Sequence, residues 1–367
     1  MTAAIAELLR TLMLTPGLSG HEGRVRRRIR AALGPLGEQT RTDRAGNLIL
    51  TLPGKDPRAP SVMLFTHMDQ LGFVVRRIEP DGLLRLERLG GVPERALAAA
   101  AVLCCVAEGR DRLGVIGHKS HHATPQEEKY RVLPYAELFV DIGAPDAAEV
   151  RAAGIDIGTP VVYEPRAVAI GEHRVAGTAV DDRAGCAVLI EAIRRLAAAN
   201  AATTVHAVFS VQEEFNLRGA VLAAQALSPD IAIQLDLMLA TDTPDLAARG
   251  DCRLGGGPGM SLYSFHGRGT LNGVIPHPAL VRLFEATAAR HAIPLQRSAQ
   301  TGVLTDNSYV QLVGRGVACI DLGFPIRYSH APMEMCDLRD LDALAALVTQ
   351  GILAIDAGFS LNREEYE

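Results

Sequence analysis

Four short apolar runs that each end at a histidine or at acidic residues constrain the fold of this chain most strongly. The runs and the residues that follow them are 62–65 with His67 and Asp69, 174–180 with Asp181 and Asp182, 205–211 with Glu213 and Glu214, and 231–235 with Asp236. Helical patterns follow two of the runs, over 184–199 and 217–227. Because short apolar strands alternate with helices, we expect an α/β sheet whose strands are at least partly parallel.

The residues at the run ends are of the types that bind metal ions. In such sheets ligands bind beyond the carboxyl ends of the strands, so the four run ends should meet at one edge. Zn²⁺ and similar ions bind imidazole nitrogen and carboxylate oxygen, and two ions ~3.5–4 Å apart need a bridging carboxylate. His330, in the loop after the apolar run 317–322, adds a second histidine.

Each of these residues also has a structural interpretation. A histidine at a strand end is usually a satisfied core or surface residue, and Asp181 and Asp182 could cap the following helix. Glu213 and Glu214 could form a solvated turn. These interpretations are hard to sustain for four consecutive strand ends at once, and a metal centre explains them together.

The stretch 71–169 differs from the segments on either side of it. It is rich in Gly and Pro, and it shows no helix of the length expected in its flanks. Short strand-like runs are expected at 73–75, 83–86, 102–106, 115–116, 138–142 and 161–162. We therefore expect a small β-rich domain, 71–169, inserted into a discontinuous α/β domain formed by 1–70 and 170–367.

The N-terminal region is predicted to form two helices. The first covers about 2–13, and Thr15-Pro16-Gly17 interrupts it. Ser19 followed by Glu22 fits a capping box, which predicts that a second helix begins there.

Composition excludes several classes of partner. A net charge of -5 gives no electrostatic footprint for nucleic acid. The longest apolar run, 96–107, is shorter than the ~20 residues that a membrane-spanning helix needs. Six scattered cysteines without a CxxC pair indicate a reducing compartment, so we expect a cytoplasmic protein.

Five segments in order resemble the M42 metallo-aminopeptidases, the glutamyl-aminopeptidase and tetrahedral-aminopeptidase group. They are 15–22 (TPGLSGHE), 67–73 (HMDQLGF), 180–186 (VDDRAGC), 212–214 (QEE) and 327–330 (RYSH). The short segments 141–144 (DIGA) and 305–306 (TD) also match. The resemblance covers nearly the whole chain, and its specificity lies in the combination of segments.

The resemblance implies a phosphorylase/hydrolase-like α/β domain, a mixed sheet flanked by helices, with a co-catalytic pair of divalent ions. Zinc is the expected metal, with cobalt or manganese as alternatives. The resemblance implies that Asp181 is the carboxylate that bridges the two ions. His67 and Asp236 would complete one ion site, and Glu214 and His330 the other. Glu213 would be the general base, and Asp69 would orient the His67 imidazole. The insertion would be the family's dimerisation domain, and members often assemble into dodecameric tetrahedra.

The implied activity is hydrolysis of the N-terminal peptide bond by metal-activated water, with Glu213 accepting the proton. Three features lie outside the family pattern or its assigned roles. Phe215-Asn216 replaces the Val-Gly type step that usually follows the glutamate pair. His118, His121 and His122 form a cluster in the insertion, interpreted as a surface loop. The segments 255–258 and 302–307 are candidates for shaping the substrate pocket.

Other functions remain open from the residues alone. A dimetal amidase or deacylase acting on a small non-peptide amide would use the same ions and base. A non-catalytic metal-binding assembly protein would not need Glu213. A glycosidase would need two carboxyl groups facing each other ~5–9 Å apart, which adjacent glutamates do not suggest. No GxSxG motif supports a serine nucleophile.

Overall fold

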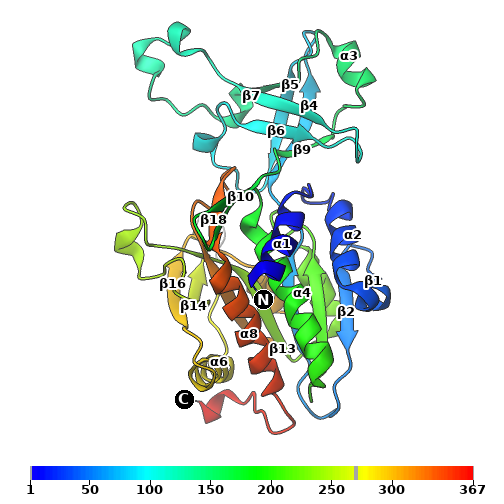
Figure 1. The fold of residues 1–367 in the computed structure, drawn as a ribbon, viewed down its shortest axis with the longest axis vertical. Coiled ribbons are helices and arrows are strands. Elements are labelled where there is room, and N and C mark those ends of the chain that lie inside the picture. The colour runs from blue at the N-terminus through cyan, green and yellow to red at the C-terminus, as the bar shows by residue number, and fades with distance from the viewer. Residues whose placement is uncertain (1, 268–271, 367) are drawn as a thin grey trace.

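A mixed sheet forms the centre of the larger of two structural units in this computed structural model, which describes residues 2–267 and 272–366 (Figure 1). Its strand order is β1 (Arg41–Thr42), β2 (Leu48–Leu52), β12 (Val205–Ser210), β3 (Val62–His67), β13 (Ile231–Leu239), β17 (Ala318–Ile326), β14 (Gly259–Phe265) and β15 (Gly273–Val274), with β16 (Gln296–Thr301) beside β14. The central strands β12, β3, β13 and β17 run parallel. They are almost wholly buried because helices cover both faces of the sheet.

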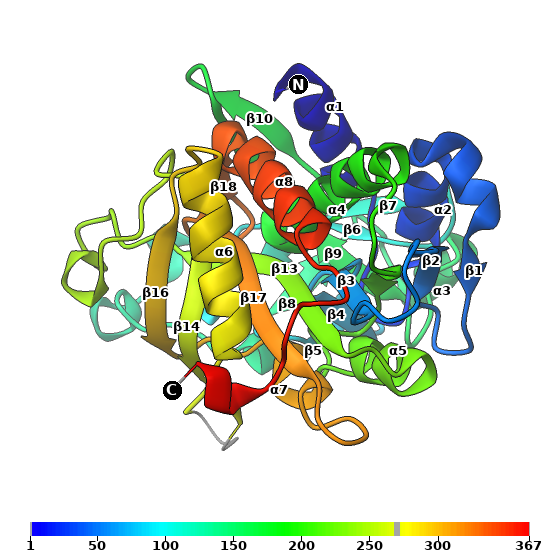
Figure 2. The same cartoon turned by 90° about the horizontal axis from the view of Figure 1, so that it is seen from below.

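The helices form a layer on each face of this sheet. One layer contains α1 (Thr2–Met13), α2 (Gly23–Ala32), α4 (Val180–Ala199), α6 (Pro278–Arg290) and α8 (Leu338–Leu353). The other contains α5 (Gly219–Leu227) and α7 (Asn307–Val310). Figure 2 shows α4 and α8 on one side of β3 and β13, and α5 on the opposite side. Side chains alternate along β3, so Leu64 packs in the first layer, and Met63 and Phe65 pack in the second.

The smaller unit is a closed β-barrel with its own apolar core, drawn above the sheet in Figure 1. Its strands follow the order β4 (Gly72–Ile78), β5 (Leu84–Leu89), β8 (Phe139–Asp141), β7 (Arg112–Gly117), β6 (Ala101–Cys104) and β9 (Pro160–Tyr163). Its α-helix α3 (Ala147–Ala152) has six residues, in agreement with the prediction that this stretch contains no long helix. The predicted fold class, an α/β unit with a mixed sheet and an added β-rich unit, is confirmed. The domain limits at 71 and 169 stay a prediction.

A small antiparallel sheet lies next to the barrel, and ion pairs between α2 and the barrel unit link the two units. The sheet joins β10 (Ala167–Ile170), β11 (Arg174–Gly177) and β18 (Glu334–Asp337) below the barrel. Arg24 of α2 donates two hydrogen bonds, of 2.5 and 2.9 Å, to the Asp111 carboxylate of the barrel unit. Short 3-10 helices lie in the connections at Gly34–Gln39, Glu94–Ala96, His121–Ala123, Gln126–Glu128, Tyr135–Glu137, Ala247–Arg249 and Arg363–Glu365.

Helix α1 lies where the sequence predicted it, but the predicted capping box is wrong. The Ser19 hydroxyl donates to the Asp69 carboxylate, 2.5 Å away, and does not cap α2, whose N-cap residue is Glu22. The Glu22 carboxylate accepts from the N–H groups of Gly20 and Gln212. Helix α2 begins after both, at Gly23. Buried groups from distant segments offered Ser19 and Glu22 better partners than the helix end did.

Two further observations bear on location. No helix within the described residues has the length and apolar character needed to cross a membrane. All six cysteines are free, and five of them are buried. The cytoplasmic location stays a prediction from the sequence.

Candidate metal centre

The predicted ligands meet at the carboxyl edge of the central parallel strands. His67 is the last residue of β3, and Asp236 lies on the neighbouring strand β13. The Asp181 carboxylate lies between the two histidines: its Oδ1 is 3.2 Å from His67 Nε2, and its Oδ2 is 3.3 Å from His330 Nε2. Each carboxylate oxygen of Asp181 therefore faces a different imidazole.

The donor atoms fall into two groups that each fit a metal ion. Ligand atoms lie within 4.8 Å of one another in the group His67, Asp182 and Asp236, and in the group Asp181, Glu214 and His330. Burial raises the pKa of Glu214 to about 7 and that of Asp182 to about 8, and the charge of Asp181 adds to both effects. Ionising several carboxylates in so small a buried space is unfavourable unless cations are present. Imidazole and carboxylate groups are also donors that divalent cations bind.

The two adjacent glutamates take different positions. The nearest histidine nitrogen to Glu214 Oε1 is His330 Nε2, at 3.6 Å, whereas Glu213 Oε2 lies 3.9 Å from His67 Nε2. Burial and the charges of Glu214, Asp306 and Asp236 raise the pKa of Glu213 well above its usual value. The Glu213 carboxylate therefore binds a proton more readily than an exposed glutamate does, as a general base must.

Asp69 connects the turn that carries both glutamates to the rest of the centre. Its Oδ1 accepts the N–H of Glu213 at 3.0 Å, and its Oδ2 accepts the N–H of Glu214 at 3.1 Å and the Ser19 hydroxyl. His67 Nδ1 lies 3.1 Å from the main-chain oxygen of Asp69 and 3.5 Å from its carboxylate. Asp69 is thus placed both to orient the His67 ring and to hold the glutamate turn.

Asp182 was a candidate ligand or helix cap from the sequence, and the family resemblance assigned no role to it or to its partner Gly185. One Asp182 oxygen accepts the Thr66 hydroxyl, and the other accepts the N–H of Gly185 at 2.9 Å. A Cβ atom on Gly185 would lie 2.3 Å from that oxygen, so only glycine admits the carboxylate here. The nearby sequence Asp181-Asp182-Arg183-Ala184-Gly185 was the available signal.

Gln234 and Glu334 were also missed, because their roles depend on contacts between distant segments. Gln234 Nε2 donates to Asp236 Oδ2 at 2.9 Å, and the N–H of Asn307 donates to Gln234 Oε1 at 2.9 Å. The Glu334 carboxylate accepts the N–H groups of Asp181 and His330. Its place four residues after His330 was the only local hint.

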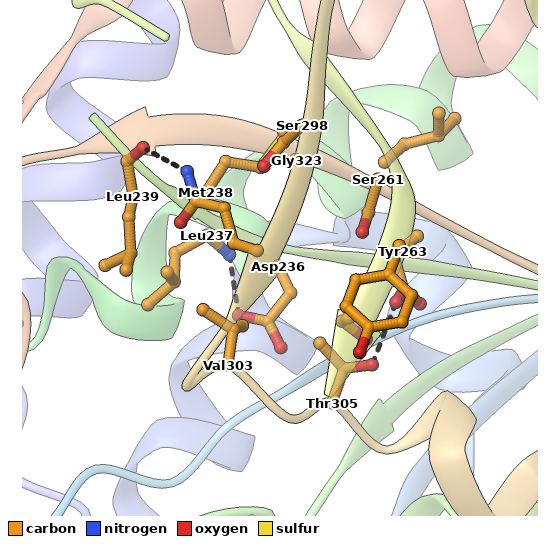
Figure 3. Close-up of a pocket in the computed structure, with 14 residues that line it drawn as sticks. Asp236, Leu237, Met238, Leu239, Ser261, Tyr263, Ser298, Val303, Thr305 and Gly323 are labelled. Atoms are coloured by element: carbon orange, nitrogen blue, oxygen red, sulfur yellow. Dashed lines mark hydrogen bonds between the residues drawn. The ribbon is translucent and has the colours of Figure 1, made fainter. Parts of the chain in front are cut away.

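A narrow pocket extends from Asp236 between β13, β14 and β16. Figure 3 shows Tyr263, Val303 and Thr305 lining it beside Asp236. Val303 and Thr305 of the segment 302–307 therefore line this pocket, and a role of the segment in shaping the substrate site stays a prediction. The segment 255–258 is not among the pocket's described lining residues, and the N–H groups of Gly255 and Gly257 instead donate to Asp340.

The remaining sequence features lie outside the ligand groups. Phe215 is partly exposed, and the Arg218 guanidinium lies 4.4 Å from the centre of its ring. His118 and His121 line a separate cavity of about 340 Å³ in the barrel unit, together with lysines and arginines. Neither metal-binding group within the described residues includes His118, His121 or His122. The interpretation of this histidine cluster as a surface loop agrees with its exposure.

A mixed α/β sheet with imidazole and carboxylate donors gathered at its carboxyl edge defines the class of metal-dependent α/β hydrolases. Within that class, the sequence matches the M42 glutamyl aminopeptidase family over residues 46–347, and the chain belongs to this family. The resemblance in the sequence is thereby confirmed, and with it a metal-dependent aminopeptidase.

Known proteins agree with this assignment. The putative aminopeptidase SgcX of Escherichia coli K12 is 37% identical over 350 residues, which cover 95% of this chain and 93% of SgcX. The aminopeptidase APDkam598 from the archaeon Desulfurococcus kamchatkensis has a TM-score of 0.91 at 31% identity, with 100% of this chain and 98% of that chain covered. The Pyrococcus horikoshii TET1 peptidase, which assembles into a tetrahedron or an octahedral shell, has a TM-score of 0.84 at 28% identity, with 96% of this chain and 100% of that chain covered.

The charge of the centre predicts how the stability of the metal-free protein depends on pH. Asp182 and Glu214 ionise near pH 4 when unfolded but only near pH 8 and 7 when folded, so the free energy of unfolding falls as pH rises from about 4 to 8. Burial lowers the pKa of His67, but the charges of Glu213 and Asp181 outweigh it and raise that pKa. The stabilisation from charged His67 is complete below about pH 6.5 and is lost as pH rises through the folded pKa, in the same direction.

With a chelator present to remove metal, the midpoint temperature of unfolding should therefore be a few degrees lower at pH 8 than at pH 5. Added zinc should remove most of this difference, since the cations offset the ionised carboxylates. A midpoint that rises between pH 5 and 8 without metal would contradict the expected charge distribution.

Proposed function

We propose that this chain is a co-catalytic dimetal aminopeptidase that removes N-terminal residues from peptides. The observation that carries the proposal is the Asp181 carboxylate, whose two oxygens lie 3.2 Å from His67 Nε2 and 3.3 Å from His330 Nε2. Such a carboxylate can bridge two ions ~3.5–4 Å apart. We assign His67 and Asp236 to one ion, and Glu214 and His330 to the other.

The bound ions would supply Lewis-acid polarisation of the scissile carbonyl and a lowered pKa of the attacking water. Glu213 takes the proton from the water and returns it to the leaving amine. The Asp69 carboxylate holds Glu213 in place by accepting the main-chain N–H of Glu213. The surrounding carboxylates attract the free N-terminal ammonium of a peptide, which favours exopeptidase action. Imidazole and carboxylate donors favour zinc, and cobalt or manganese fit the same donors.

A substrate comparison tests the proposal. The metal-loaded protein should hydrolyse aminoacyl-anilides and short peptides with free N-termini, because the ammonium group is part of what the site binds. N-acetylated versions of the same peptides should react at least ~10²-fold more slowly, since they lack that charge. Faster hydrolysis of N-acyl amino acids than of peptides would favour the dimetal amidase or deacylase, and metal binding without any turnover would favour an assembly protein.

Substitutions of the two glutamates should show which residue transfers the proton and which binds metal. Glu213→Gln keeps the shape of the side chain and removes the base, so it should retain both ions and lose at least ~10²-fold in kcat. Glu214→Gln should lose affinity for one ion, and high metal concentration should restore part of its activity. Calorimetric metal titration with parallel kcat measurements distinguishes them. Metal loss in Glu213→Gln, or near-normal turnover, would refute the role given to Glu213.

We also propose that the barrel unit mediates self-association, dimers first and a dodecamer beyond them. The P. horikoshii TET1 peptidase supports this as a relative that forms closed shells. Light scattering should show the intact protein larger than a monomer at micromolar concentration. Deletion of 71–169 should give a smaller species with damaged activity, because His330 Nδ1 then loses its partner, the Gly91 carbonyl. An intact protein that is monomeric would contradict the proposal.

A further inference from the structure

A single buried carboxylate holds two of the proposed ligands through their main chains. Glu334 is the first residue of β18, and its side chain is 2% exposed. Its Oε2 accepts the N–H of Asp181 at 3.0 Å, and its Oε1 accepts the N–H of His330 at 2.5 Å. Both partners are assigned to the second ion, and Asp181 also bridges to the first. Glu334 therefore fixes the distance between two ligands that lie far apart in the sequence.

The loop that carries His330 needs such a restraint. Tyr328 and His330 have positive φ angles of 61° and 68°, a conformation that costs free energy for residues other than glycine. Main-chain hydrogen bonds between Arg327 and Met335 close the base of the loop, at 2.9 and 3.0 Å. They do not reach His330 itself. Glu334 supplies the contact that holds the main chain at His330 in this strained form.

The imidazole of His330 is oriented from the other side by the barrel unit. Its Nδ1 lies 2.9 Å from the main-chain oxygen of Gly91, so the ring donates there and leaves Nε2 facing Asp181 Oδ2. A Cβ atom on Gly91 would lie 2.9 Å from Nδ1, which keeps this approach open only for glycine. Gly91 thus orients the His330 imidazole, and Glu334 holds the main chain of His330 in place.

We propose that Glu334 is a positioning residue of the second ion site, one that holds Asp181 and His330 at the separation that a shared ion requires. The inference rests on the two-ion centre proposed above. Glu334 acts through the two main-chain N–H groups, and its two carboxylate oxygens are both used in those contacts. A glutamine could accept only one of the two N–H groups, since its amide nitrogen is a donor.

Zinc titration of the metal-free protein by calorimetry tests this role. In Glu334→Gln, affinity for the second ion should fall about 10–100-fold, the usual effect of losing a partner that orients a ligand. Affinity for the first ion, bound by His67 and Asp236, should fall less, because only the shared Asp181 carboxylate is disturbed there. At limiting zinc, kcat should fall with little change in KM, and excess zinc should restore part of it. Glu334→Asp keeps both oxygens and should fall between the wild type and Glu334→Gln.

Asp340 provides a matched control. It is also a buried carboxylate that accepts two main-chain N–H groups, those of Gly255 and Gly257, each at 2.8 Å. Neither glycine is a proposed ligand. Asp340→Asn should therefore lower thermal stability and leave both zinc affinities as in the wild type.

Two results would overturn the inference: wild-type affinity for both ions in Glu334→Gln, or an equal loss at both sites. If Glu334→Gln does not fold, Glu334→Asp decides, and an unchanged second site in that variant would equally refute the role. The failure of the proposed activity is distinguishable. A wild type that binds two zinc ions without peptidase activity would refute the activity, while the titration would still measure what Glu334 does.

Discussion

Mutual repulsion among buried carboxylates at one sheet edge is the constraint on which the rest of the centre depends. The side chains of Asp181, Glu213 and Glu214 are each 10% exposed or less and lie close together, where like charges are costly. The chain offsets this cost with two histidines and with main-chain N–H groups directed at acids outside the two groups of metal-binding donors. Asp69 and Glu334 each accept two such N–H groups.

These paired acceptors give the centre its rigidity. Asp69 holds the turn of the two glutamates, and Glu334 holds Asp181 and His330. Each bond joins segments more than a hundred residues apart, except for the short contact between Glu334 and His330. The main chains of Asp181, Glu214 and His330 are thus held by carboxylates from distant or neighbouring segments.

Sequence reasoning placed His67, Glu214 and Asp236 near one another because parallel strands bring their carboxyl ends to the same edge, whatever their order in the sheet. Asp181 instead follows β11, a strand of the small antiparallel sheet. The sequence could not predict Glu334 or Gln234, since nothing local marks a side chain whose partner is the main chain of another segment. The capping box failed for a related reason: Ser19 met the buried Asp69 carboxylate, a stronger partner than a helix end. The closure of the barrel depends on register between distant strands, which short apolar runs do not encode.

The barrel separates His67 from Asp181 in the chain, and His330 comes after all the other proposed ligands. A polypeptide emerging from the ribosome therefore carries its first ligands long before its last. The donor group of Asp181, Glu214 and His330 forms only after the segment with His330 and Glu334 has been synthesised and has packed against Asp181. The order of the ligands along the chain keeps an unfinished copy of this peptidase from forming the complete two-ion centre that we propose for peptide cleavage.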